Sequence, residues 1–199
     1  MRIEASEAGA IIVEERDSLA IVRLNRPAER NSLSRSTLEE LEQAVSALTN
    51  RRELTAIIFT GTGDVFASGA NIRELSSLTP DSARAFAHLG QRVFQKIADA
   101  RALTIAAVNG YCMGGGLDLA LACKLRVAST GAVFAHPGAR LGIITGWGGT
   151  QRLPRLIGTA RALEMFMTAR RLTSIEAYEI GLINRIGDPA LECAFEFVK

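Results

Sequence analysis

Residues 104–123, TIAAVNGYCMGGGLDLALAC, join a buried strand to a helix through a run of three glycines. The apolar residues 104–108 are typical of a strand that is covered on both faces. The glycines at 114–116 let the backbone adopt positive φ and let a ligand approach closely. Because the first N–H groups of a helix are unbonded and lie at the positive end of its dipole, this turn favours an anion or a developing oxyanion. A tight strand-to-helix packing turn would need the same glycines, so the run alone leaves both interpretations open.

A second glycine-bearing loop, Ser68-Gly69-Ala70-Asn71, follows another buried strand at 55–60. Two such loops at the ends of two strands can each supply one N–H group to the same carbonyl oxygen, which is the arrangement of an oxyanion hole. A phosphate-binding loop is disfavoured, because no Lys-Ser/Thr pair follows the glycines and they lack GxGxxG spacing.

The rest of the chain predicts alternating strands and helices, and hence a single α/β domain over residues 1–199. Two strands at 11–15 and 19–24 flank a tight turn at Asp17-Ser18. The helix that follows is predicted to begin at the N-cap Ser36. Further strands are expected at 125–128 and 133–135, and further helices at 80–102, 158–168, 174–181 and from 189 onward.

Composition indicates a soluble globular protein, since 48% of the 199 residues are hydrophobic and 22% are charged. The formal net charge of +2 is too small to indicate nucleic acid or an anionic membrane as a partner. The three cysteines, Cys112, Cys123 and Cys193, have no CxxC spacing, which fits free thiols in a reducing compartment and neither a disulfide framework nor a metal site. Charged residues near the N-terminus argue against a signal peptide, and the longest apolar stretch is interrupted by Asn109 and Asp118. We therefore expect a cytoplasmic protein.

Four segments of the chain are motifs of one known family and occur in its order. They are LNRPAERNSL at 24–33, FASGANIREL at 66–75, NGYCMGGGLDLALAC at 109–123 and LGIITGWGGTQRLPRLIG at 141–158. With TARRLTSIEAYEIGLINRI at 168–186, they resemble the crotonase (enoyl-CoA hydratase/isomerase) family over nearly the whole chain. Each motif alone is weak, but the set is highly specific.

The resemblance implies a crotonase-type α/β fold, which is a repeated strand-strand-helix (ββα) spiral. The core of the spiral is expected at about 8–188. The usual C-terminal helices are expected to be missing or shortened in residues 189–199. It implies an acyl-CoA thioester substrate from fatty-acid or related metabolism, with coenzyme A as part of the substrate and with no separate cofactor or metal. It also implies a homotrimer or a dimer of trimers. The N–H groups of Ala70 and Gly115 match the family's two oxyanion positions and would stabilise an enolate formed next to the thioester.

The same resemblance predicts where coenzyme A binds. The family's nucleotide and pantetheine contacts match Ala28, Arg30, Ala67, Ser68, Asn71, Ile72 and Arg73. Arg73 is a candidate partner of the CoA phosphates, and a solvated arginine at a helix start is the alternative. Tyr111 and Trp147 flank glycine loops and are candidates for the acyl pocket, although packing in the core would explain both.

Two positions depart from the hydratases of the family, which use two glutamates to hold and activate water. Asp118 stands at the first position as the candidate acid/base residue, and pairing with the helix dipole is its alternative role. Gly138 matches the second position, in the substrate site, and carries no side chain for acid–base work. His136 faces the same side as Gly138 if the segment is extended, which makes it a pocket candidate, against the simpler interpretation of a hydrogen-bonded structural histidine.

These departures leave three functions open. The resemblance favours an enoyl-CoA hydratase/isomerase-type lyase with Asp118 as its only carboxylate acid/base. A double-bond isomerase or decarboxylase of the same fold needs an oxyanion hole and fewer acid–base groups. A member that binds acyl-CoA without catalysis is the third. Dienoyl-CoA isomerases, naphthoyl-CoA synthases and dehalogenases match no better, because catalytic side chains of theirs would fall on Gly138, Thr145 or Gly146.

Overall fold

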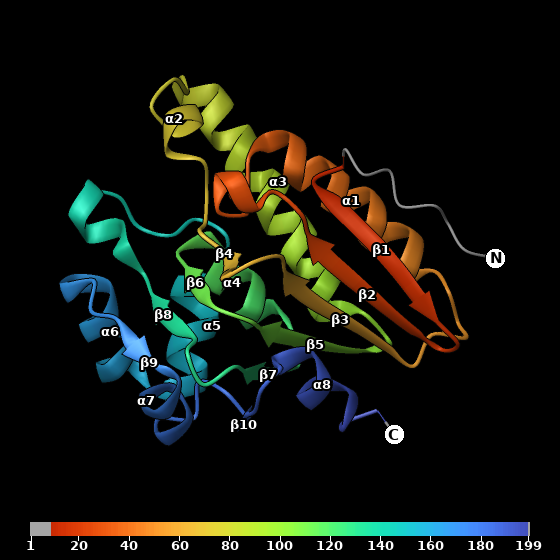
Figure 1. The fold of residues 1–199 in the computed structure, drawn as a ribbon. Helices are drawn as coiled ribbons and strands as arrows, with labels where there is room; N and C mark the ends of the chain where they lie inside the picture. Colours follow the sequence, from red (N-terminus) through yellow and green to blue (C-terminus); the bar gives the residue numbers. More distant parts are fainter. Residues whose placement is uncertain (1–8, 199) are drawn as a thin grey trace.

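Two mostly parallel sheets form the framework of the computed structural model, which describes residues 9–198 (Figure 1). The larger sheet has the order β1 (Ile11–Arg16), β2 (Leu19–Leu24), β3 (Ala56–Gly61), β5 (Leu103–Val108), β7 (Leu125–Ala128) and β10 (Arg185–Ile186). The smaller sheet has the order β4 (Val65–Ala67), β6 (Tyr111–Met113), β8 (Val133–Ala135) and β9 (Leu172–Thr173). Only the β1–β2 and β8–β9 pairs of these sheets are antiparallel.

Successive strand-strand-helix units wind through both sheets. The three units from β3 to β8 each place one strand in the larger sheet and the next in the smaller sheet before they enter a helix, so that β3, β5 and β7 are parallel neighbours, as are β4, β6 and β8. This arrangement is the ββα spiral that the resemblance implies. The helices are α1 (Arg35–Thr49), α2 (Ile72–Leu75), α3 (Pro80–Asp99), α4 (Gly115–Ala122), α5 (Gly149–Ile157), α6 (Thr159–Thr168), α7 (Ser174–Glu179) and α8 (Ala190–Phe195), with 3-10 turns at Pro27–Glu29 and Pro137–Leu141. Within residues 9–198, no helix has both the length and the apolarity to cross a membrane.

The sequence pattern missed β4, β6 and α5. Strands of three residues are too short to show alternation, and α5 contains Pro154, which is typical of a helix boundary. The predicted N-cap Ser36 is wrong by two residues, because Ser34 Oγ accepts the hydrogen bond from the Thr37 N–H at 3.1 Å. Helix α3 ends at Asp99, earlier than the predicted 102.

Helix α4 lies at the centre of the molecule, and every residue from 116 to 122 is buried. It follows β6 directly, so the glycine run is held between the smaller sheet and the core. Trp147 packs on the same core, with its ring centroid 5.3 Å from that of Phe86 and 5.7 Å from that of Phe94, both edge to face. Such aromatic pairs are rigid anchors, so Trp147 and the start of α4 hold each other in place.

Arg126 on β7 is a buried cation that is held by carbonyl oxygens. Its Nε donates to Leu182 O at 2.8 Å, and its Nη1 donates to Cys123 O at 2.7 Å and to Ala120 O at 3.5 Å. Burial lowers the pKa of this guanidinium. The side chain therefore ties the end of α4 to the segment before β10.

We expect Arg126→Met to lower the free energy of unfolding by about 2–4 kcal/mol, because two or three buried carbonyl groups lose their donor. Chemical denaturation monitored by circular dichroism checks this. Arg84→Met is the control, since Arg84 is exposed on α3 and its ion pair with Asp81 contributes less than about 1 kcal/mol. Equal effects of the two substitutions would contradict the structural role of Arg126.

Candidate active site

A cavity of about 1040 Å³ opens where β4 and β6 end, between α2, α3 and the segment from β8 to Trp147. Most of its wall is apolar and includes Leu75, Phe86, Leu141, Ile143, Phe166 and Met167. Its backbone-lined part consists of Ser68–Ala70 and Gly114–Gly115. A site of this size and composition suits an apolar ligand with one polar group.

Two main-chain N–H groups border this cavity side by side. A Cβ placed on Gly115 would lie 3.5 Å from Ala70 N, and a Cβ placed on Gly69 would lie 3.0 Å from Gly115 N. Among residues 9–198, neither the Ala70 N–H nor the Gly115 N–H has a hydrogen-bond acceptor. The loop that carries Ala70 is held from the other side, because Leu33 N donates to Gly69 O at 2.8 Å. The structure thus brings two free amide donors together at one cavity wall.

Two of the glycines are required by this geometry. Gly69 has a φ of 95°, which L side chains rarely adopt. Gly115 faces the ring of Trp147, and a Cβ there would lie 2.3 Å from Trp147 Cζ3. The aromatic anchor therefore leaves room only for glycine at the helix start, and it brings the Gly115 amide to the cavity surface.

The residues predicted to bind coenzyme A lie on two adjacent segments. Ser68 N donates to Arg30 O at 3.1 Å, which joins the 3-10 turn carrying Ala28 to the loop after β4. Asn71 caps α2 by accepting from the Arg73 and Glu74 N–H groups. Of the predicted set, Ser68, Ile72 and Gly138 line the cavity, whereas Ala67 is buried in β4 and Ala28, Arg30 and Arg73 are exposed outside it.

The two aromatic pocket candidates have different positions. Trp147 lines the cavity. Tyr111 is half-buried on β6, outside the cavity wall, with the Arg30 guanidinium 5.1 Å above its ring centroid.

Asp118 is completely buried in the first turn of α4 and does not line the cavity. Its Oδ2 accepts a hydrogen bond from Thr145 Oγ1, and its Oδ1 lies 3.4 Å from His136 Nε2. Both partners line the cavity, although His136 is only 3% exposed. The structure therefore places His136 at the cavity wall and Asp118 behind it. Among the described residues, Oδ1 and Nε2 are buried atoms without a hydrogen bond.

Burial sets the protonation of this pair. It raises the pKa of Asp118 to about 7, although the Thr145 hydrogen bond, backbone amides and the Arg152 charge act to lower it. Burial also lowers the pKa of His136 to about 4. At neutral pH the imidazole is neutral and the carboxyl group is near its titration midpoint, as an acid/base residue requires.

Gly138 lies in the 3-10 turn after β8, and the backbone leaves no space for a side chain there. A Cβ on Gly138 would lie 2.5 Å from Ile143 O, because the Ile143 N–H bonds Gly138 O at 3.0 Å and closes the turn. A glutamate at this position would require the turn to rearrange.

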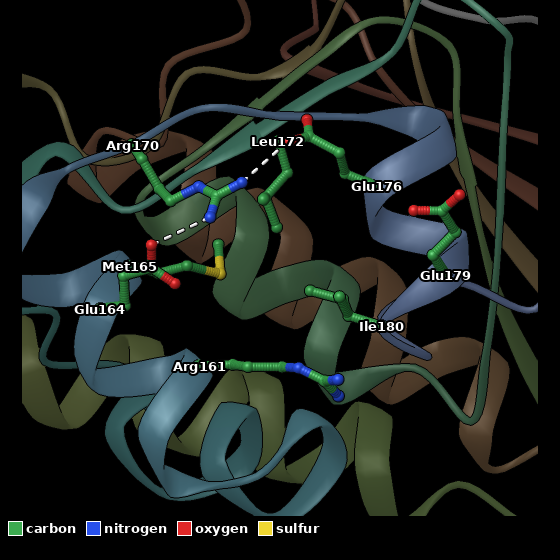
Figure 2. A pocket seen from close by; sticks show the side chains of 8 residues that line it. All are labelled: Arg161, Glu164, Met165, Arg170, Leu172, Glu176, Glu179 and Ile180. Carbon is green, nitrogen blue, oxygen red and sulfur yellow. Dashed lines mark hydrogen bonds and ion pairs between the residues drawn. The ribbon is translucent and has the colours of Figure 1, made fainter.

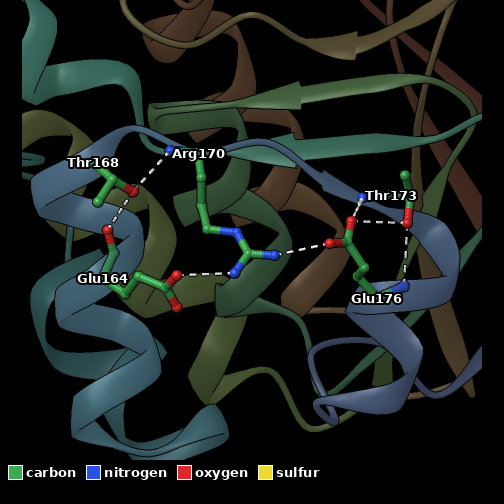
Figure 3. A network of polar contacts seen from close by, with 5 residues as sticks. All are labelled: Glu164, Thr168, Arg170, Thr173 and Glu176. Carbon is green, nitrogen blue, oxygen red and sulfur yellow. Dashed lines mark hydrogen bonds and ion pairs between the residues drawn. The ribbon is translucent and has the colours of Figure 1, made fainter.

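A second, smaller hollow of about 260 Å³ lies between α6 and α7 (Figure 2). Arg170 crosses it and pairs with Glu164 of α6 at 3.0 Å and with Glu176 of α7 at 2.8 Å (Figure 3). Glu176 in turn completes a capping box with Thr173. These charges bind one another and hold α6 against α7, so the hollow has the features of a structural ion-pair network.

Comparisons with known proteins show the family of the chain. Residues 14–192 match the family model of enoyl-CoA hydratase/isomerase. The chain belongs to the enoyl-CoA hydratase/isomerase family. A relative in Syntrophomonas wolfei, named crotonyl-CoA hydratase, is 42% identical over 180 residues, which are 90% of this chain and 69% of that protein. A short-chain-enoyl-CoA hydratase of Clostridium acetobutylicum is 38% identical over 92% of this chain and 71% of its own.

Solved structures similar to this chain have the same fold. The crystal structure of an enoyl-CoA hydratase from Bacillus anthracis superposes with a TM-score of 0.91 at 34% identity, covering 95% of this chain and 75% of that chain. The structure of DspI from Pseudomonas aeruginosa superposes with a TM-score of 0.92 at 32% identity, covering 99% of this chain and 82% of that chain.

Sequence reasoning missed the part that Thr145 and Arg152 play around Asp118. Thr145 lies 27 residues after Asp118 in an irregular segment, so no periodicity connects the two. Arg152, on the helix α5 that the pattern did not predict, contributes its charge. The one signal that the sequence offered is a polar residue directly before a glycine, Thr145-Gly146.

Proposed function

We propose that this family member converts acyl-CoA thioesters by stabilising their enolates, with hydration of a 2-enoyl-CoA as its reaction. The observation that carries the proposal is the pair of amides at the wall of an apolar cavity, Ala70 and Gly115, which have no acceptor among residues 9–198. A thioester carbonyl oxygen between them would accept both N–H groups. These bonds strengthen as negative charge develops on that oxygen, which is the condition for catalysis.

The rest of the site fits the two ends of such a substrate. The apolar wall from Leu141 to Ile144 and Phe166 suits a short acyl chain. Arg73 follows the cavity-lining Ile72, and Arg30 is joined through its carbonyl to the cavity-lining Ser68, so these two exposed cations are candidates for the CoA phosphates. Asp118 supplies the carboxyl group of the site. A cytoplasmic homotrimer or dimer of trimers, without a separate cofactor, belongs to the same proposal.

A specific observation favours a second candidate, an isomerase or decarboxylase of the same fold. The second acid–base position is Gly138, and Ile143 O occupies the place where its side chain would begin. Moving a double bond needs one group that removes and returns a proton, and decarboxylation needs only a proton donor. Both reactions proceed through the same enolate.

The test is binding and turnover by the wild-type protein. We expect crotonyl-CoA to bind and to be hydrated, as measured by calorimetry and by loss of the enoyl absorbance. A 3-enoyl-CoA and a malonyl-type thioester, followed by mass spectrometry, test the second candidate. If only the 3-enoyl-CoA or the malonyl-type thioester is converted, the second candidate replaces hydration as the proposed reaction. Binding without conversion of any thioester would leave a non-catalytic acyl-CoA-binding protein, and absence of binding would overturn the proposal.

A further inference from the structure

Asp118 is separated from the cavity that it would serve. Its side chain has no exposed surface, whereas His136 and Thr145, which meet its two oxygens, line the cavity. Direct contact between the carboxyl group and a bound thioester would require one of these side chains to move. Of the two, only His136 has a basic nitrogen, so only its ring can accept a proton on one nitrogen while it releases the proton of the other and stays neutral.

The two atoms that face each other in this pair both lack a hydrogen bond among the described residues. Asp118 Oδ1 and His136 Nε2 are both completely buried, lie 3.4 Å apart and make no hydrogen bond of ordinary geometry within residues 9–198, although the Trp147 and Gly149 amides are close enough to the carboxyl group to lower its pKa. Buried polar atoms are nearly always bonded. Their 3.4 Å separation is slightly longer than an ordinary hydrogen bond, so a small approach would let a single proton on either atom join them. With two protons the pair would have two donors facing each other, and with none it would have two acceptors. The geometry therefore suits a pair that holds a single proton.

We propose that His136 is the catalytic proton carrier of this site and that Asp118 is its buried proton partner. The inference rests on the proposed acyl-CoA function. Because Nε2 faces Asp118, Nδ1 is the ring nitrogen left for water or for the thioester. Phe166, whose ring centroid lies 5.0 Å from that of His136, fixes the imidazole from the side of α6.

The proton balance of a hydration step follows from this arrangement. The water oxygen bonds to C3 of the enoyl group as the C2–C3 π electrons move into the enolate, and the water proton passes to Nδ1. The imidazole releases its Nε2 proton to the Asp118 carboxylate, so it stays neutral. When the enolate collapses, Nδ1 gives its proton to C2, and the Asp118 proton returns to Nε2. Water has added, and the pair ends as it began.

The surroundings of the pair set the pH at which it changes form. The Arg152 guanidinium on α5 acts on Asp118 through its charge, and the buried Cys112 thiol on β6 is close enough to feel the Asp118 charge. Because burial raises the pKa of Asp118 to about 7 and lowers that of His136 to about 4, the pair carries one proton more below about pH 7 than above it. The imidazole stays neutral in both forms. Its hydrogen lies on Nδ1 in the acid form and on Nε2 in the base form.

Nuclear magnetic resonance tests the shared proton without any assay of activity. The chain has only two histidines, and His88 is exposed on α3, so His88→Gln leaves one imidazole signal set in histidine-¹⁵N-labelled protein. We expect His136 to change tautomer with a midpoint near pH 7 and to remain neutral from about pH 5 to about pH 9. Asp118→Asn in the same background should abolish the step. An imidazolium forming near an ordinary pKa of about 6.5, or a tautomer step that survives in Asp118→Asn, would overturn the proposal.

Steady-state kinetics tests the catalytic role. We expect His136→Gln to lower kcat for crotonyl-CoA by about 10²-fold or more, to leave KM within about threefold and to remove the rise of kcat/KM through pH 7. His88→Gln should change none of these values. A kcat within about threefold of wild type would overturn the role of His136. If the wild-type protein converts no thioester, the proposed function and the catalytic role fail together, while the magnetic resonance result still decides the shared proton.

Discussion

Gly115→Ala is expected to lower kcat/KM for crotonyl-CoA by about 10²–10³, the typical cost of losing one oxyanion donor. The added Cβ would lie 2.3 Å from Trp147 Cζ3. Trp147 is packed edge to face against Phe86 and Phe94, so the ring cannot turn away without opening the core. The backbone at 115 must therefore shift, and the amide moves out of line with that of Ala70. Steady-state kinetics with the thioester checks this.

A matched control and a rescue separate this cause from general damage. Gly131→Ala adds the same methyl group at an exposed turn where no atom of the described residues lies within 4 Å of it, and it should leave the rate unchanged. Gly115→Ala with Trp147→Leu removes the clash, so we expect the double variant to recover part of the rate lost by Gly115→Ala. A Gly115→Ala protein that melts like wild type and keeps its rate would show that the Gly115 amide does not act on the thioester.

The place of the central glycine run could be predicted from the sequence, because it depends only on the strand directly before the run and the helix directly after it. The strand before it and the helix after it appear in the hydrophobic pattern, and the resemblance identifies Ala70 and Gly115 among several free amides. The physical reason for glycine at 115 is not local. It is the ring of Trp147, 32 residues later, and only the packed core shows that contact.

The surroundings of Asp118 and His136 were less predictable, because they too depend on contacts between residues far apart in the sequence. Asp118 was identified by its place after the glycines, but its burial depends on α5 and on the segment that carries Thr145. His136 was favoured as a hydrogen-bonded structural residue, and the structure gives its Nε2 no hydrogen bond among the described residues. A contact between two side chains 18 positions apart, on α4 and after β8, requires the winding of the spiral.

Asp118→Asn is expected to lower kcat for crotonyl-CoA by about 10²–10⁴, because the site loses its titrating carboxyl group. The substitution keeps the shape of the side chain, and its amide oxygen can still accept the hydrogen bond from Thr145. Affinity for the thioester should change little, since the side chain does not line the cavity. Stopped turnover assays and calorimetric binding measure the two quantities separately.

The same variant should gain stability relative to the wild type as the pH rises, which distinguishes lost chemistry from lost structure. Burial raises the pKa of Asp118 from 3.8 to about 7, so the folded wild-type protein binds more protons than the unfolded chain between these values. Its free energy of unfolding therefore falls as the pH rises through this window, by about 4 kcal/mol at most. The asparagine side chain of the variant does not titrate, so the stability of the variant has no such dependence on pH.

The lowered pKa of His136 destabilises both proteins below about pH 6.5, so this effect cancels in the difference between them. We expect Asp118→Asn to gain on the wild type in urea denaturation between about pH 4 and about pH 8, while its turnover stays low throughout. A constant difference across this range would mean that the Asp118 carboxyl group titrates as an ordinary solvated one, and the buried acid/base role would then be lost.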